Sequence, residues 1–369
     1  MDFIKGMDIS MLPELEELGV HYYNEGKEQE LFTILKEKGA NMLRFRLWNH
    51  PYDEKQESYG GGTNDLEKLI SLATRAKEQE IPYILDFHYS DFWTDPKKQI
   101  KPKEWKLFGL EELQKAVYEY TLHTLQLLKE RGLLPKMVQV GNEITNGFLW
   151  PEGQIACYRY CESEQENRDY ANLFSLLKEG IRAVRECDET IQIILHLDYG
   201  GDNGLYREWF DKAKEARLDY DIIGLSYYPY WHGSLSDLEN NLQDISKRYQ
   251  KDVLIVETAY GFTVEEKENC ILIFNNELAQ SAGYPPTPKG QGEFLHDLAT
   301  CIKSIEDNRG IGFVYWEPAW LPIKGSTWGA KEGQIYMSDE APEGNSWANQ
   351  ALFDYDGNAL PAWEIIKDM

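Results

Sequence analysis

The sequence predicts an α/β fold in which eight parallel strands alternate with helices and close into a barrel. The main observation is that eight short apolar runs recur along the chain, separated by amphipathic helical patterns. Such alternation favours a parallel sheet with right-handed crossovers, and eight units close into a (β/α)8 TIM barrel. A length of 369 residues with 42% hydrophobic content suits one barrel with insertions. No linker separates the units, so we expect a single domain over residues 1–369.

The predicted strands are short runs rich in β-branched and aromatic residues. They cover residues 3–9, 42–47, 83–87, 137–140, 191–195, 222–225, 253–256 and 312–315. The predicted helices between them carry apolar residues three or four positions apart. They cover residues 28–38, 65–77, 110–131, 169–187, 205–216, 235–249 and 292–307, and a last short helix starts at 361. A long insertion follows the seventh strand.

Two of the predicted strands end at a glutamate. Glu143 follows Val-Gln-Val-Gly-Asn, and Glu257 follows Val-Leu-Ile-Val. In a parallel barrel the catalytic groups lie at the carboxyl ends of the strands. Cleavage of a glycosidic bond needs two carboxyls, one to protonate the leaving oxygen and one ionised to attack or stabilise the sugar cation. Alternatively, either glutamate is a structural ion-pair partner, although a charge at a strand end is costly unless it is used or paired.

Two arginines lie on one face of the second predicted strand. Arg44 and Arg46 alternate with Leu43 and Phe45, so their side chains point the same way. Two cations on an inward face require carboxylates nearby. An ion pair at the base of the barrel is the alternative to a role in the site.

Composition excludes several classes of partner. The formal net charge is −25, with 63 acidic and 38 basic residues, which argues against nucleic acid and anionic membranes. No apolar run approaches the roughly 18 residues of a membrane span. The five cysteines show neither a CxxC motif nor a disulfide framework. No predicted strand ends in His-x-His, so a metal-dependent hydrolase is not expected.

Longer motifs stand at the strand ends. They are Asp-Phe-His-Tyr-Ser-Asp-Phe-Trp at 86–93, Gly-Asn-Glu-Ile at 141–144, His-Leu-Asp at 196–198, Tyr-Tyr-Pro at 227–229, Val-Glu-Thr at 256–258 and Tyr-Trp-Glu-Pro-Ala-Trp at 315–320. Together with residues 281–288 and 349–353, they resemble glycoside hydrolase family 53, the endo-β-1,4-galactanases of clan A. The resemblance implies a retaining mechanism on β-1,4-galactan, or pectic type I arabinogalactan, with Glu143 as acid/base and Glu257 as nucleophile.

The resemblance also implies roles for neighbouring residues. Asn142 resembles the residue that binds the sugar 2-hydroxyl, and Arg44 the arginine that holds the nucleophile ionised, since a nearby cation lowers a carboxyl pKa. Tyr227 resembles the aromatic residue whose hydroxyl touches the nucleophile. Trp316 resembles the platform under the sugar.

Further side chains are candidates for sugar contacts. His88 is a hydroxyl contact or a partner of Glu143, unless it is a hydrogen-bonded core histidine. Asp91 and Asp198 contact sugar or form supporting ion pairs. The candidates for stacking on successive sugars, with a core role as the alternative, are Trp93, Trp231, Trp320 and Trp347.

One segment departs from the family pattern. Many members carry a calcium loop after the seventh strand, built from closely spaced Asp, His and Asn. Here residues 263–270 are acidic, but Lys267 lies among them and no Asp-x-Asp spacing occurs. We therefore expect no metal and no required cofactor.

Two other functions remain open from the sequence. The first is another clan A β-glycanase, acting on mannan or β-glucan with the same two glutamates. The second is a non-catalytic sugar-binding barrel, against which the retention of Glu143, Glu257 and Asn142 argues. The expected partners are β-1,4-galactan or galacto-oligosaccharides, with no nucleic acid or membrane, and the expected state is a monomer. No signal peptide precedes the first strand, which predicts a cytoplasmic enzyme if the sequence is native and a secreted one if a leader was trimmed.

Overall fold

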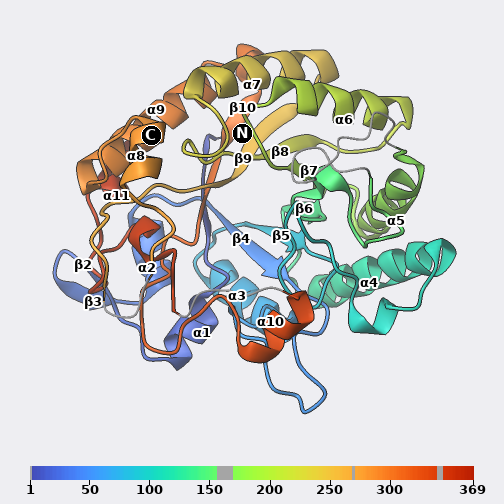
Figure 1. Ribbon diagram of the computed structural model, residues 1–369, viewed down its shortest axis with the longest axis horizontal. Coiled ribbons are helices and arrows are strands. Elements are labelled where there is room, and N and C mark those ends of the chain that lie inside the picture. The colour runs from blue at the N-terminus through green and yellow to red at the C-terminus, as the bar shows by residue number, and fades with distance from the viewer. Residues whose placement is uncertain (1, 156–168, 268–270, 339–343) are drawn as a thin grey trace.

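The computed structural model describes residues 2–155, 169–267, 271–338 and 344–369. Eight parallel strands close into a barrel in the order β1-β10-β9-β8-β7-β6-β5-β4, which confirms the predicted fold class. The helices surround the strands as an outer ring (Figure 1). The barrel strands are β1 (Ile4–Asp8), β4 (Met42–Leu47), β5 (Tyr83–Phe87), β6 (Met137–Val140), β7 (Gln192–Leu197), β8 (Ile222–Ser226), β9 (Asp252–Thr258) and β10 (Gly310–Trp316).

Each helix of the ring buries one face against the strands or a neighbouring helix. The long helices are α3 (Leu66–Glu78), α4 (Leu110–Glu130), α5 (Ala171–Cys187), α6 (Asn203–Glu215), α7 (Leu235–Tyr249) and α9 (Pro288–Lys303). The shorter ones are α1 (Leu12–Glu17), α2 (Leu31–Glu37), α8 (Asn276–Ala282), α10 (Lys331–Met337) and α11 (Ala362–Asp368). No helix in the described part of the chain has the length and apolar character needed to cross a membrane.

Several predicted boundaries were wrong. The segment predicted as helix from residue 28 starts as β3 (Lys27–Gln29), which pairs with β2 (Tyr22–Asn24) as a hairpin. Helix α9 starts at Pro288 rather than at residue 292, because the Thr287 hydroxyl caps it by accepting a hydrogen bond from Gly290 N at 3.1 Å. Helices α1, α8 and α10 were not predicted from the sequence. These elements are too short for a periodic pattern to stand out.

The barrel interior changes character along its axis. A separate cluster of buried apolar residues lies inside the barrel, most of them in the amino-terminal half of their strands: Ile4, Met42, Ile84, Met137, Ile194, Ile222, Leu254, Val256, Ile311 and Val314. Two residues further along four of these strands, on the same face, lie Arg44, Asp86, Gln139 and His196. The arginines of β4 therefore point into the barrel above an apolar floor, and not into its base. This polar layer lies directly below the side chains at the carboxyl ends of the strands.

The backbone is strained where four strands end. Tyr89, Glu143, Tyr199 and Glu317 all have φ values between 47° and 51°. The left-handed region costs a non-glycine residue about 1–3 kcal/mol and is tolerated mainly at functional sites. Gly141, with φ of 88°, precedes Glu143, and a Cβ there would lie 2.6 Å from the Ile144 side chain. The sharp turn after β6 therefore needs glycine at this position, and it directs Glu143 into the rim.

Of the cysteines, Cys187 and Cys301 are buried free thiols. Cys157, Cys161 and Cys270 lie outside the described residues.

Candidate active site

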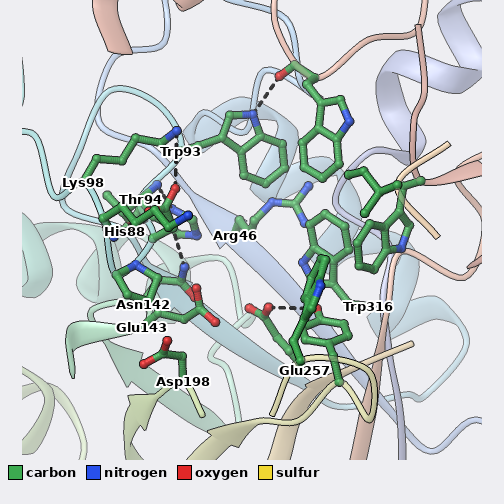
Figure 2. Close-up of a pocket in the computed structure, with 18 of the residues that line it drawn as sticks. Arg46, His88, Trp93, Thr94, Lys98, Asn142, Glu143, Asp198, Glu257 and Trp316 are labelled. Atoms are coloured by element: carbon green, nitrogen blue, oxygen red, sulfur yellow. Dashed lines mark hydrogen bonds and ion pairs between the residues drawn. The ribbon is translucent and has the colours of Figure 1, made fainter. Parts of the chain in front are cut away.

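A pocket of about 620 Å³ opens at the carboxyl ends of the strands. Glu143, three residues after β6, and Glu257, near the end of β9, both line it. Figure 2 shows the two carboxyl groups pointing toward each other across the pocket. This pair was expected at the strand ends, and the barrel brings the two residues together although they are 114 positions apart in the sequence (257 − 143).

Arg44 links Glu257 to the polar layer of the barrel. Its guanidinium lies 2.9 Å from Glu257 Oε1 and donates to Asp8 and Asp86, each at 2.8 Å. It also donates to Asn142 Oδ1 at 3.1 Å. The side chain is fully buried, and although burial lowers its pKa, these carboxylates raise the pKa above its ordinary value. Arg44 is therefore a permanent cation beside Glu257, as the resemblance implied.

Burial raises the pKa of Glu257 to about 7, and Arg44 only partly opposes that rise. This corrects the expectation that Arg44 holds the Glu257 pKa low. The physical reason is that Arg44 is shared: Asp86, whose own pKa is lowered by Arg44 and His88 against its burial, and Asp8 both compete for the cation. Nearby negative charge makes it harder to ionise Glu257.

Glu143 has a less cationic setting than Glu257, but not a drier one, because Glu143 is partly exposed whereas Glu257 is buried. Burial, Glu257 and Asp198 raise its pKa well above the ordinary value, and a hydrogen bond from Ser226 works against that rise. Glu257 has the Arg44 cation to stabilise its charged form, whereas Glu143 has only the neutral donor Ser226. The pair therefore favours an ionised Glu257 beside a protonated Glu143.

A hydrogen-bond chain runs from Glu143 back into the barrel. Ser226 Oγ donates to Glu143 Oε1 at 2.6 Å, and His196 Nε2 lies 2.8 Å from Ser226 Oγ. On the other side of the ring, Nδ1 faces two donors, Gln139 Nε2 at 2.7 Å and Glu143 N at 3.3 Å. Nδ1 must therefore accept, so Nε2 carries the proton and donates to Ser226. Burial lowers the pKa of His196 well below its ordinary value, consistent with this neutral form.

The second arginine of β4 faces the pocket. The Arg46 guanidinium lies 2.7 Å from Glu317 Oε1 and 3.2 Å from Asp8 Oδ1. It also lies 4.5 Å from the centre of the Trp93 ring and 5.5 Å from that of Trp316. Arg46 thus holds two pocket tryptophans in place by cation–π contacts (Figure 2).

Tryptophans cover one side of the pocket. Trp316 stacks on Trp328 with centroids 5.7 Å apart and planes at 19°, and meets Trp347 edge-on at 4.9 Å. The Trp93 indole N–H donates to Trp328 O at 2.7 Å. Trp93, Trp231, Trp316 and Trp347 all line the pocket as predicted, and Trp328 is an addition.

Three predicted polar contacts also line the pocket. His88 accepts from Thr94 N through Nδ1 at 3.3 Å, and its Nε2 lies 3.1 Å from Asp86. It is thus held by Asp86 and Thr94. Asn142 donates to Thr94 O at 2.9 Å, while the Asp198 carboxylate accepts from the Thr145 hydroxyl. These hydrogen bonds fix all three side chains, which present polar atoms to the pocket.

The prediction that the Tyr227 hydroxyl touches Glu257 was wrong. That hydroxyl donates to Gly233 O at 3.0 Å, whereas Tyr228 OH donates to Glu257 Oε2 at 3.2 Å. Side chains alternate between inward and outward along β8, which explains this contact: Ser226 points inward to Glu143, and the next inward residue is Tyr228. The sequence alone could not show which of the two tyrosines faces inward, because the pairing of β8 with β9 is irregular at Ser226.

Two further candidates, Asp91 and Trp320, lie outside the pocket lining. The Asp91 carboxylate accepts from His50 N at 3.0 Å and Lys103 N at 2.8 Å, so it holds a loop. Trp320 is fully buried, and its indole N–H donates to Ser326 Oγ at 2.7 Å. Both residues therefore have structural roles, which were the alternatives to sugar contact left open from the sequence.

The described residues contain no group of three or more His, Cys, Asp or Glu side chains arranged to hold a metal ion. In the loop after β9, where many family members carry calcium, residues 268–270 lie outside the described part of the chain. Lys267 in the same loop lies 3.0 Å from Asp356 Oδ1.

Paired glutamates at the strand ends of a parallel barrel, set in a pocket lined with tryptophans, define a class of enzyme, the glycoside hydrolases. The chain belongs to glycosyl hydrolase family 53, whose model matches residues 4–366. It is 42% identical, over 99% of its length and 93% of the other, to a Niallia circulans protein described as an uncharacterized protein in the bgaB 5' region.

Other relatives carry functional names. The chain is 36% identical to the endo-β-1,4-galactanase of Bacillus subtilis, covering 99% of this chain and 86% of that protein. Among solved structures, the GH53 catalytic domain of Ignisphaera aggregans superposes with a TM-score of 0.90 at 39% identity, over 99% of this chain and 95% of that one.

Proposed function

We propose that this protein is a retaining endo-β-1,4-galactanase. The observation that carries the proposal is the unequal setting of the two glutamates in one pocket. Glu257 touches the buried cation Arg44, whereas Glu143 accepts from the neutral Ser226 and lies among other acids. Glycosidases need this division between an ionised carboxylate and a protonated carboxyl.

In the proposed first step, Glu257 attacks the anomeric carbon while Glu143 gives its proton to the glycosidic oxygen, so that the leaving chain departs as an alcohol. The covalent ester removes the charge of Glu257. Glu143, which has already given up its proton and no longer faces that charge, stays ionised. It takes a proton from an incoming water, whose oxygen attacks the anomeric carbon and releases the Glu257 carboxylate. A mechanism of this kind requires the carboxyls to lie about 5–5.5 Å apart.

The galactan substrate and the endo mode are supported by the relatives. The Bacillus subtilis protein is named an endo-β-1,4-galactanase, and a Cellvibrio japonicus protein, 36% identical over 99% of this chain, is named an arabinogalactan endo-β-1,4-galactanase. We propose the same substrate class here, and an enzyme that acts as a monomer.

The test compares linear β-1,4-galactan with β-1,4-mannan and mixed β-glucan. We expect galactan to be cleaved internally, with a rapid fall in viscosity and a mixture of oligosaccharides. Preferred cleavage of mannan or glucan would assign a different clan A activity, and no turnover of any polymer would favour a sugar-binding barrel.

Azide rescue tests the two glutamates. Glu143→Ala should lose activity on galactan, keep activity on an aryl β-galactoside whose leaving group needs no proton, and form a β-galactosyl azide, since two inversions occur. Glu257→Ala with azide should form the α-azide by one inversion. Exchanged anomers would mean that the acid and the nucleophile are exchanged.

A further inference from the structure

A second cavity, of about 310 Å³, lies next to the catalytic pocket. It is lined by the loop after β8, the start of α7 and the end of α8: Tyr227, Pro229, Tyr230, Trp231, Gly233, Ser234, Leu235, Ser281, Ala282 and Tyr284. Its volume falls at the lower end of the range for small-molecule sites. The catalytic chemistry described above uses none of the residues that line this cavity alone.

Trp231 joins the two spaces, since it lines both. It is 43% exposed, whereas Trp347, its neighbour on the side of the catalytic pocket, is 3% exposed. A core role therefore does not explain Trp231. Large apolar side chains that remain exposed beside a cleft are typical of interaction sites.

The Trp231 ring is held in position by its neighbours. Tyr230 contacts it edge-on with centroids 4.8 Å apart, and Tyr228 does so at 5.6 Å. The ring of Trp347 lies 6.4 Å away on the pocket side. Trp231 thus continues the tryptophan wall of the catalytic pocket outward as a fixed aromatic surface.

The chemistry of the cavity selects a class of ligand. The ten lining residues include no charged side chain, which disfavours phosphate or uronic acid. They supply aromatic rings together with two exposed serines, of which Ser234 caps α7 through Asp237 and Ser281 lies near the end of α8. A sugar matches this surface, because one face of a pyranose is apolar while its edge carries hydroxyls that serine can meet.

We propose that the cavity beside Trp231 is a second carbohydrate-binding site, which takes one neutral galactosyl unit and is joined to the catalytic pocket through Trp231. The identity of the sugar rests on the proposed function. The unit comes either from the distant end of the chain being cleaved or from a side branch or second chain.

The test uses Ser281→Trp, which adds a bulky side chain to the cavity lining without touching the catalytic pocket. Ser71→Trp is the matched control, since Ser71 is also an exposed serine within a helix and lines neither space. We expect Ser281→Trp to lower kcat/KM on polymeric galactan about threefold to tenfold, or about 0.7–1.4 kcal/mol. It should leave kcat/KM on galactotriose unchanged. Ser71→Trp should match the wild type on both.

Substrate structure separates the two sources of the sugar. If the unit belongs to the cleaved chain, the loss will appear on linear oligosaccharides above a certain length. If it belongs to a branch or second chain, linear oligosaccharides of every length will be unaffected while branched arabinogalactan is cleaved more slowly. Wild-type kinetics of Ser281→Trp on all substrates, or an equal loss on galactotriose, would overturn the proposal.

A binding measurement keeps the test independent of turnover. In the Glu143→Ala background, retardation of the native protein in gels that contain galactan should weaken when Ser281→Trp is added, with a dissociation constant raised threefold to tenfold. Unchanged retardation would reject the second site. A wild type that fails to cleave galactan would instead reject the proposed function.

Discussion

Replacing Ser226 by alanine should raise the pKa of Glu143. The Ser226 hydroxyl donates to Glu143 Oε1 at 2.6 Å, and its oxygen accepts a hydrogen bond from His196 Nε2 at 2.8 Å. A donor stabilises a carboxylate more than a carboxylic acid, so it holds the pKa of Glu143 below the value that burial alone would set. The substitution removes this donor and leaves Arg44, Glu257 and the backbone turn in place.

The size of the shift follows from the strength of the bond. A hydrogen bond to a charged group contributes ~1.5–3 kcal/mol, and one pKa unit corresponds to about 1.36 kcal/mol. The pKa of Glu143 should therefore rise by about 1–2 units. Because Glu143 must be protonated for the first step, the alkaline limb of the pH profile should move upward by the same amount.

The assay is kcat/KM on galactan as a function of pH, which reports the ionisations of the free enzyme. Ser246→Ala is the matched control, since Ser246 is also buried but donates to Gln243 O within its own helix. The control should leave the profile unchanged. An alkaline limb that stays in place, or moves to lower pH, in a folded Ser226→Ala enzyme would refute the assignment of Ser226 as the donor to the acid.

Three further predictions concern Tyr228, Glu143 and the loop after β9. Tyr228→Phe should move the acid limb of the kcat/KM profile upward by about one pH unit, because Glu257 loses a neutral donor. Tyr227→Phe should leave that limb in place. Equal shifts in the two variants would contradict the contact between Tyr228 and Glu257. Glu143→Gln should raise the melting temperature at pH 8 but not at pH 4. A carboxyl whose pKa is raised in the folded state destabilises the fold only at pH values where the same carboxyl is ionised in the unfolded chain. Calorimetry at both pH values tests this, and a higher melting temperature at pH 4 would contradict it. Finally, elemental analysis of protein purified without chelator should find no stoichiometric calcium bound at residues 263–270, and one calcium per chain at that loop would refute this.

The sequence by itself determined the barrel and the pair of glutamates. Eight apolar runs predicted the strands, and three of them, β4, β5 and β6, match the structure to the residue. Because the carboxyl ends of parallel strands meet at one rim, a glutamate at the end of two strands places both carboxyls in one site whatever the exact loops do. That is why Glu143 and Glu257 could be located without any tertiary information.

Only the tertiary structure decided what surrounds them. Strand β8 pairs with β9 through an irregular register between Leu225 and Ser226, and the side-chain parity there puts Ser226 on Glu143 and Tyr228, rather than Tyr227, on Glu257. A shift of one residue in the register of a strand reverses which of its side chains face inward. No local sequence pattern determines which residue of another strand each inward side chain contacts. The raised pKa of Glu257 likewise depends on four strands at once. Burial in the barrel raises it most, and Arg44 opposes this only in part because it also pairs with Asp8 and Asp86.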